Sequence, residues 1–278
     1  MDIHLISNEL KLGNDGIWYS IDTQNISYPV DGHNECLLIE EKSFWFKHRN
    51  NCILSAIKNY PPKDGGTIFD IGGGNGFVSS MLATSGFDVA LVEPGRVGAL
   101  NARRRGLNTV ICSSLNTAQF KSHSLSAIGL FDVIEHIEDD LSFLKSIKEL
   151  IKKEGRLYIT VPAYPLLWSE EDIFAGHFRR YTLKRICEVI KHADFKVEYA
   201  TYFFRFLPIP IAFLRTIPYR LGLSRAEKKK VEASNHHVIK NKVFTNILSS
   251  LFDSEIENLR KNKSMAFGGS CLIVAKVS

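Results

Sequence analysis

A cluster of glycines between an apolar run and a helical pattern is the part of this sequence best suited to chemistry. Residues 68–77 read Ile-Phe-Asp-Ile-Gly-Gly-Gly-Asn-Gly-Phe, and the next apolar run, residues 88–94, carries an acid, Glu93, near its end. Glycines at a strand-to-helix turn let the backbone approach a ligand closely. A carboxylate at the tip of the following strand can hold both hydroxyls of a ribose. This pairing indicates a nucleoside ligand.

The spacing of the glycines indicates which nucleoside cofactor the loop accepts. A dinucleotide loop reads Gly-x-Gly-x-x-Gly, but counting from Gly72 the third position is Phe77. The chain reads Asp70-x-Gly72-x-Gly74-x-Gly76, which resembles motif I of class I S-adenosylmethionine-dependent methyltransferases. An acid suits the ammonium group of S-adenosylmethionine (SAM) and would repel a pyrophosphate. The resemblance implies that this motif, together with the acid of the next run, binds SAM.

A second segment with candidate catalytic residues follows the fourth predicted strand. Residues 129–140 closely resemble the Asp-Val-Leu-Glu-His-Ile-x-Asp segment of a large methyltransferase subgroup, where this strand tip lies beside the reactive methyl group. Ligands of open α/β sheets bind beyond the carboxyl ends of strands. His136 is a candidate general base, or it braces the following helix. Asp132 is a candidate to face cofactor or substrate, and the resemblance adds Leu130 to the cofactor contacts.

An aromatic and basic segment precedes the first strand of the pattern. Residues 44–49 read Phe-Trp-Phe-Lys-His-Arg, and similar segments in the same subgroup form a helix over the cofactor. Arginine can bind a carboxylate through two parallel hydrogen bonds. Arg49 is therefore the candidate for the SAM carboxylate, with His48 as the alternative. Trp45 is a candidate substrate contact, although such aromatic residues also serve as core or lid packing.

A basic loop follows the fifth predicted strand. Residues 176–182 read Gly-His-Phe-Arg-Arg-Tyr-Thr and resemble the Gly-His and Arg-Arg-Tyr segments of the subgroup. Arg179, Arg180 and Tyr181 could grip an anionic or polyhydroxyl substrate. His177 is a second candidate base. The alternative is that Arg180 and Tyr181 fix the loop to the next helix.

The adenine end of the site is less clearly marked. The family often places an acid after the third strand, against the adenine amino group. The chain has Ser113-Ser114-Leu115 there, without an acid. Ser114, Leu115 or backbone groups would have to contact the adenine. This departure leaves the glycine loop and Glu93 unaffected.

Composition restricts the class of protein. The 278 residues carry a net charge of +5 that does not gather into one long basic tract, so nucleic acid binding is not indicated. Five cysteines are an odd number, widely spaced and without a Cys-x-x-Cys pair, which argues against a disulfide framework and a zinc site. No metal is expected. No signal peptide pattern opens the chain, so a cytoplasmic location is the expectation.

Strand-like and helical runs alternate from residue 67 onward. Such alternation predicts an α/β fold, a parallel sheet with helices on both faces. The resemblance implies that this sheet is Rossmann-like, seven-stranded and mainly parallel. The last run would enter antiparallel beside the fifth strand, as in class I methyltransferases. The expected strands lie at 67–72, 88–93, 108–113, 125–131, 156–161, 195–201 and 270–277, and the expected helices at 41–58, 76–85, 95–105, 137–153 and 182–193.

Four parts of the chain follow from this pattern. An N-terminal extension with a lid helix (1–64) precedes the cofactor-binding core (65–201). An apolar and helical insertion (202–268) then separates the core from the final strand (269–278). Because the plain fold has only a short hairpin at this point, the insertion is the expected seat of substrate specificity.

An apolar stretch, residues 203–222, dominates the insertion and is interrupted by three arginines and three prolines. A membrane-spanning helix needs about 20 uninterrupted apolar residues, so the stretch is not expected to cross a bilayer. It could form a hydrophobic cap over the active site or a homodimer interface. It could also contact the inner face of a membrane peripherally, helped by the basic residues 228–230.

The resemblance covers residues 41–201 and 268–277 and implies a SAM-dependent methyltransferase. The sulfonium methyl would pass by direct displacement to a nucleophile held near attack distance. Residues 28–36 and 44–50 resemble segments of bacterial surface-polysaccharide enzymes, which suggests a sugar or lipid-linked sugar acceptor. A small metabolite or a lipid is the second acceptor class. A module that binds SAM without turnover is the alternative from another functional class.

Overall fold

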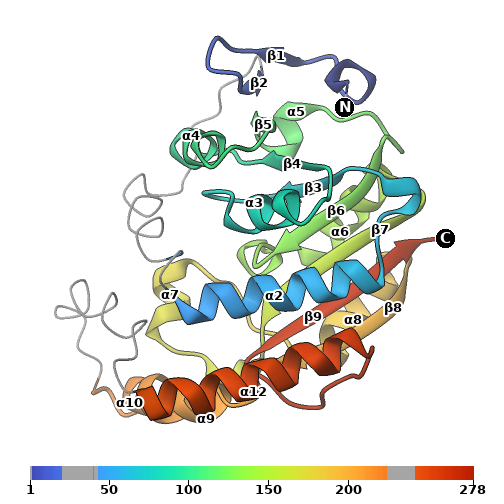
Figure 1. Ribbon diagram of the computed structural model, residues 1–278. Helices are drawn as coiled ribbons and strands as arrows, with labels where there is room; N and C mark the ends of the chain where they lie inside the picture. The colour runs from blue at the N-terminus through green and yellow to red at the C-terminus, as the bar shows by residue number, and fades with distance from the viewer. Residues whose placement is uncertain (1, 21–39, 41–42, 224–241) are drawn as a thin grey trace.

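A computed structural model describes residues 2–20, 40, 43–223 and 242–278 of the chain. Figure 1 shows a central sheet with helices in front of it and behind it. Two segments discussed above lie outside the described residues. These are residues 28–36, which resemble surface-polysaccharide enzymes, and the basic residues 228–230, which were considered for membrane contact.

The described part of the chain forms one sheet in the order β1-β2-β5-β4-β3-β6-β7-β9-β8. Strands β3 to β7 are parallel, and β9 is antiparallel to both of its neighbours, as predicted. The predicted number of seven strands is wrong, because the N-terminal extension adds an antiparallel hairpin whose second strand pairs with β5. The strands are β1 (Leu10–Leu12), β2 (Trp18–Ser20), β3 (Ile68–Ile71), β4 (Val89–Val92), β5 (Thr109–Cys112), β6 (Leu125–Phe131), β7 (Ile151–Pro162), β8 (Phe195–Phe203) and β9 (Ser270–Val277).

Helices cover both faces of the sheet because side chains alternate between the faces along each strand. In β3, Ile68 packs into a cluster with α2, α3 and α12, whereas Phe69 and Ile71 pack into a cluster with α5, α6 and α8. The α-helices are α2 (Phe44–Asn59), α3 (Phe77–Thr84), α4 (Arg96–Arg104), α5 (Leu115–Ala118), α6 (Asp140–Leu150), α7 (Glu170–Ala175), α8 (Leu183–His192), α9 (Pro208–Ile211), α10 (Ile217–Arg220) and α12 (Lys242–Arg260). Short turns of other helix types are η1 (Ile3–Leu5), η2 (Lys63–Gly65), η3 (Ile134–His136), η4 (Pro165–Leu167) and the π-helical η5 (Ala212–Thr216).

The junction between α6 and β7 differs from the prediction. The helix expected over 137–153 ends at Leu150, and β7 begins at the next residue, Ile151. A side chain at Gly155 would place its Cβ 2.5 Å from Ile151 Cγ2 and 2.7 Å from the Ser126 carbonyl oxygen. The helical prediction fails here because the chain pairs with β6, and glycine permits the close approach where the register between β6 and β7 shifts.

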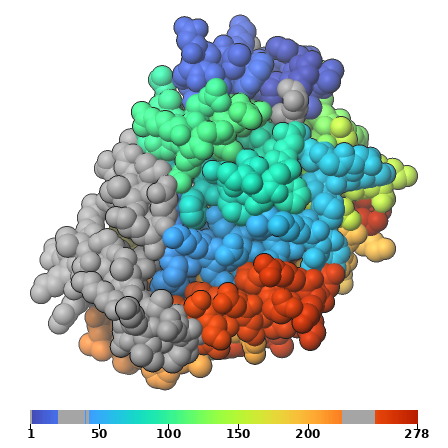
Figure 2. All heavy atoms as spheres, viewed as in Figure 1, coloured from blue at the N-terminus to red at the C-terminus, as the bar shows by residue number. Residues whose placement is uncertain are grey.

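The described residues of the insertion before β9 include two helical segments. Helices α9, η5 and α10 follow one another without a break over residues 208–220. Helix α12 lies beside α2, and Figure 2 shows their atoms in red and blue on the same face of the molecule. Within the described ranges, no helix combines the length and the apolar character needed to cross a membrane.

Candidate cofactor and acceptor site

The glycine loop joins β3 to α3. Gly72, Gly74 and Gly76 have positive φ angles of 70°, 55° and 75°. A Cβ at Gly76 would lie 2.8 Å from Ala102 Cβ, so glycine lets α3 begin close to α4. A Cβ at Gly74 would meet no described atom within 4 Å. The tip of the loop therefore presents open backbone to which a ligand can come close.

Two buried carboxyl groups flank this loop. The Asp70 carboxylate accepts a hydrogen bond from Ser79 Oγ at 2.6 Å, and burial raises the pKa of Asp70 to about 6. The Glu93 carboxylate accepts hydrogen bonds from the backbone N–H of Gly74 at 2.9 Å and of Gly95 at 2.6 Å. Burial raises the pKa of Glu93 to about 7. The acid thus holds the glycine loop against the end of β4.

Arg49 extends from α2 to the tip of β6. Its Nη1 donates to Asp132 Oδ2, and Thr160 Oγ1 donates to Asp132 Oδ1 at 3.0 Å. The guanidinium lies over the rings of Trp45 and Phe46, 5.3 and 5.6 Å from their centroids. Arg49 Nε is buried and has no hydrogen-bond partner among the described residues. One buried donor is therefore available to a ligand.

Trp45 and His48, the other two candidates within residues 44–49, pack against neighbouring side chains in this structure. The Trp45 ring stacks on Phe204 with centroids 5.4 Å apart. His48 is buried and lies 2.8 Å from Glu255 of α12. These contacts correspond to the lid-packing alternative, because both side chains join α2 to the insertion.

Two histidines from distant parts of the sequence meet beyond the tip of β6. The rings of His136 and His177 lie 4.8 Å apart in an edge-to-face arrangement. His177 Nδ1 lies 2.9 Å from Asp172 Oδ1. Burial, followed by the neighbouring His177, lowers the pKa of His136. The sequence proposed both histidines separately, and the structure brings them together.

Asp172 of α7 is the residue at this site that sequence reasoning missed. Its carboxylate also accepts hydrogen bonds from Arg180 Nε at 2.7 Å and the Ser169 backbone N–H at 2.9 Å. Burial would raise the pKa of Asp172, but the hydrogen bonds from His177 and Arg180 outweigh it and lower the pKa to about 2. The sequence does not mark this acid although His177 and Arg180 follow it by only 5 and 8 residues, because these contacts form only when the loop folds back onto α7.

Glu135, which lies in the candidate catalytic segment 129–140, is almost completely buried. Burial, together with the nearby Asp132, raises the pKa of the Glu135 carboxyl well above its ordinary value. Its Oε2 has no hydrogen-bond partner among the described residues. A buried acceptor without a partner marks this position as one that a ligand or a bound water can complete.

Two residues of the basic loop hold the loop in place. Tyr181 is buried, and its hydroxyl donates to Asp140 Oδ2 at 2.8 Å. Arg179 Nη1 lies 3.0 Å from the same oxygen. Arg180, bound to Asp172, is the member of this group that lies next to the histidine pair. These contacts fix the loop to the start of α6, whereas the structural alternative considered for Tyr181 was attachment to the next helix, 182–193.

The residues proposed for the adenine end have mainly local contacts. Ser114 caps α5 and exchanges hydrogen bonds with Thr117. Leu115 is partly buried against the core beside it, and Leu130 is completely buried within that core. These contacts account for the position of each residue by packing or helix capping alone.

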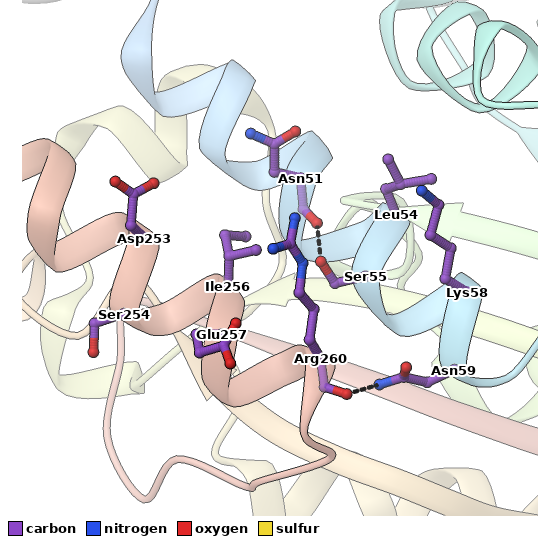
Figure 3. Close-up of a pocket in the computed structure, with 10 residues that line it drawn as sticks. All are labelled: Asn51, Leu54, Ser55, Lys58, Asn59, Asp253, Ser254, Ile256, Glu257 and Arg260. Atoms are coloured by element: carbon purple, nitrogen blue, oxygen red, sulfur yellow. Dashed lines mark hydrogen bonds between the residues drawn. The ribbon is translucent and has the colours of Figure 1, made fainter.

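A groove of about 780 Å³ lies elsewhere, between the second halves of α2 and α12 (Figure 3). Its walls include Asn51, Lys58, Glu257 and Arg260. None of the site residues predicted from the sequence lines it. The candidate site is therefore the edge of the sheet at the glycine loop and the histidine pair, and not this groove.

The sheet order and the acid-flanked glycine loop define the class of this protein as a Rossmann-like methyltransferase domain. A family model described as a methyltransferase domain matches residues 45–200, which is more than half of the chain. The chain belongs to this family of SAM-dependent methyltransferases.

The relatives identified by sequence match this chain over only part of their own length. A ubiquinone biosynthesis O-methyltransferase of Haemophilus ducreyi is 28% identical over 118 residues, covering 37% of this chain and 50% of the relative. One of Vibrio cholerae is 26% identical over 102 residues, covering 34% of this chain and 42% of the relative. The chain thus spans half or less of these two relatives.

Solved structures show the same fold. Haemonchus contortus phosphoethanolamine N-methyltransferase 2 in complex with SAM superposes with a TM-score of 0.54 at 18% identity, over 91% of this chain and 58% of that chain. A SAM-dependent methyltransferase of Archaeoglobus fulgidus gives 0.51 at 15% identity, over 86% of this chain and 98% of that chain.

The groups around the glycine loop fit SAM chemically. The unpartnered Arg49 Nε is a donor for the carboxylate of its amino-acid end. Asp70 offers negative charge for its ammonium and sulfonium groups. Both Glu93 oxygens accept backbone hydrogen bonds, and because a carboxylate oxygen can accept more than one, this acid suits a ribose hydroxyl donor.

Proposed function

We propose that the chain transfers the methyl group of SAM to a hydroxyl group of an acceptor that has an apolar portion. The observation that carries this proposal is the hydrogen bond between Asp172 and His177, next to His136 and to the Arg49–Asp132 pair. A hydroxyl must lose a proton when it is methylated, so a positioned base is useful. The names of the two relatives, both O-methyltransferases, support this reaction type.

His177 is the base in this proposal. Because Asp172 is ionised, His177 carries its proton on Nδ1 and leaves the Nε2 lone pair available. Bound SAM supplies an electrophilic methyl group on a sulfonium. With SAM bound, His177 Nε2 would take the proton of the acceptor hydroxyl as that oxygen is methylated. Asp172 would stabilise the resulting imidazolium, and Glu93, Asp70 and Arg49 would hold SAM.

We propose a narrower class of acceptor than the sequence suggested. The two relatives are named for ubiquinone biosynthesis, so the expected surface-polysaccharide sugar has no support from them. Exposed apolar residues next to His177, such as Phe174 and Phe178, favour an acceptor with an apolar portion. We therefore propose a phenolic or other hydroxylated small molecule or lipid.

The test is methyl transfer from labelled SAM to a panel of phenols, hydroxylated lipids and sugars. His177→Ala and Asp172→Asn should each lower kcat by about 100-fold or more, since a positioned base contributes factors of this size. The KM for SAM should change little, because neither residue belongs to the glycine loop. His192→Ala, an exposed histidine on α8, is the matched control and should retain full activity.

Two results would contradict this assignment. Turnover of His177→Ala within about twofold of the native value would remove the base role, given the factors expected for general base catalysis. Loss of activity in EDTA with recovery on adding Zn²⁺ would instead point to a metal among Glu135, His136 and His177, whose potential ligand atoms lie within 4.8 Å of one another. Melting curves of each variant would separate loss of fold from loss of chemistry.

A further inference from the structure

A large apolar patch is exposed on the helical segment that runs from α9 to the end of α10 and on the neighbouring α7. Exposed fractions are 86% for Phe174, 73% for Leu214 and 66% for Phe213. Ile209, Leu221 and Leu223 add exposed fractions of 60 to 67%. Several large apolar side chains exposed on two neighbouring elements, α7 and the α9–α10 segment, mark an interaction site. We call these six residues the apolar patch.

The segment is held firmly to the body of the protein by its other side. Thr216 is buried, and its hydroxyl donates to the Leu167 carbonyl oxygen at 3.0 Å. Arg220 Nη2 donates to the Leu166 carbonyl oxygen at 3.0 Å, and Arg215 Nε lies 3.7 Å from Glu171. With this side anchored to η4 and α7, the patch points outward. The exposed fractions of these side chains are those of a surface element, because the side chains of a cap over the active site would be buried.

Charge around the apolar patch favours an anionic partner. Residues 203–223 contain three arginines and no acid, and Arg205, Arg215 and Arg220 are all exposed. Glu170 and Glu171 of α7, the second of them next to Arg215, offset part of this charge. Two copies meeting through this face would bring their arginines together at unfavourable electrostatic cost. An anionic lipid surface attracts the arginines and accepts large protruding apolar side chains.

We propose that the apolar patch docks the protein onto an anionic lipid bilayer. Helix α7 links this surface to the candidate site, because its Asp172 is buried against His177 whereas its Phe174 protrudes from the patch. Docking would place the entrance beside His177 at the bilayer surface, where an acceptor with an apolar portion resides. This last step rests on the proposed function; the docking itself does not.

The test is flotation of the full chain with phosphatidylcholine vesicles, with and without phosphatidylglycerol, in the absence of SAM. The native chain should float with the anionic vesicles and less with the neutral ones. Phe213→Ser combined with Leu214→Ser should lower the partition coefficient by about tenfold to a hundredfold, from the loss of buried apolar groups. Arg205→Gln, which removes an exposed cation, should weaken binding to anionic vesicles and reduce its sensitivity to salt.

Matched controls come from the opposite end of the sheet. Leu12→Ser removes an exposed leucine of β1, and Arg104→Gln removes an exposed cation of α4; both should float like the native chain. Native protein that stays in the soluble fraction would overturn the proposal. So would self-association by analytical ultracentrifugation that disappears in the Phe213/Leu214 variant, since that result identifies a second copy as the partner. Because flotation needs no SAM, its failure is distinguishable from a failure of methyl transfer.

Discussion

At the scale of single residues, the two acids of the cofactor site hold protons more tightly than ordinary carboxyl groups. Burial raises the pKa of Asp70 from 3.8 to about 6 and that of Glu93 from 4.5 to about 7. Without a ligand, the stability that these groups contribute is present below about pH 4 and is lost as the pH rises through 6 and 7. A cationic ligand that donates hydrogen bonds reverses this preference for the protonated carboxyl groups, because it favours their ionised forms.

SAM affinity should therefore depend on pH. If the ionised carboxyls bind SAM, affinity should fall by about tenfold or more between pH 7.5 and pH 5.5. Binding at pH 6.5 should also release protons to the buffer. Isothermal titration calorimetry in buffers of different ionisation enthalpy measures both quantities.

A neutral isostere provides the control for this prediction. Glu93→Gln should bind SAM more weakly at pH 7.5, and its affinity should vary less with pH. An affinity of the native chain that is constant from pH 5.5 to 7.5 would show that neither acid needs to ionise for SAM to bind.

At the scale of elements, α2 links the site to the insertion. Arg49 of α2 reaches the β6 tip, and the neighbouring His48 forms a fully buried pair with Glu255 of α12 at 2.8 Å. Glu255 also accepts the backbone N–H groups of Phe204 and Arg205. One carboxylate thus fixes α2, α12 and the end of β8 relative to one another.

Removing this carboxylate should destabilise the fold strongly. Glu255→Ala leaves buried donors without an acceptor, and breaking a buried pair typically costs about 3–5 kcal/mol of unfolding free energy. Urea unfolding followed by circular dichroism measures this loss. Glu257→Ala, an exposed acid paired with Lys261 on the same helix, should leave the unfolding curve unchanged. Equal stability of the two variants would refute the structural role of the buried pair.

At the scale of the whole molecule, the N-terminal hairpin belongs to the core of the fold. Ile17 is completely buried in a cluster with Leu91 and Val110, and Trp18 pairs with Ile111 of β5. The hairpin extends the sheet to nine strands and covers the edge that β5 would otherwise expose.

Truncating Ile17, the buried side chain of the hairpin, should therefore lower the global stability of the protein. Ile17→Ala should cost about 2–5 kcal/mol, as for other large-to-small changes in a packed core. Thermal unfolding measures the effect, and Leu12→Ala, an exposed position of β1, should change the melting temperature little. A melting temperature of Ile17→Ala equal to that of the native chain would mean that the hairpin is not part of the cooperative unit.

Features that depend on residues near one another in the chain were predictable from the sequence, whereas features that depend on distant residues were not. Alternating apolar runs placed β3 to β9 and most of the helices that cover them, because side-chain periodicity is a local property. The runs at 1–20 were too short to predict that β1 and β2 join the sheet. The last helical residues of 137–153 were misassigned, because pairing with β6 overrode the local helical pattern.

The amino-acid sequence by itself determined the glycine loop, its flanking acids Asp70 and Glu93 and the strand tip at His136, because each depends on residues near one another in the chain. Tertiary structure alone decided that the Asp172–His177 pair lies beside His136 at that tip, and that apolar side chains of residues 209–223 in the insertion are exposed, while Phe203 and Phe204 are buried. These features depend on how whole helices and strands pack, because packing brings together side chains that are far apart in the sequence.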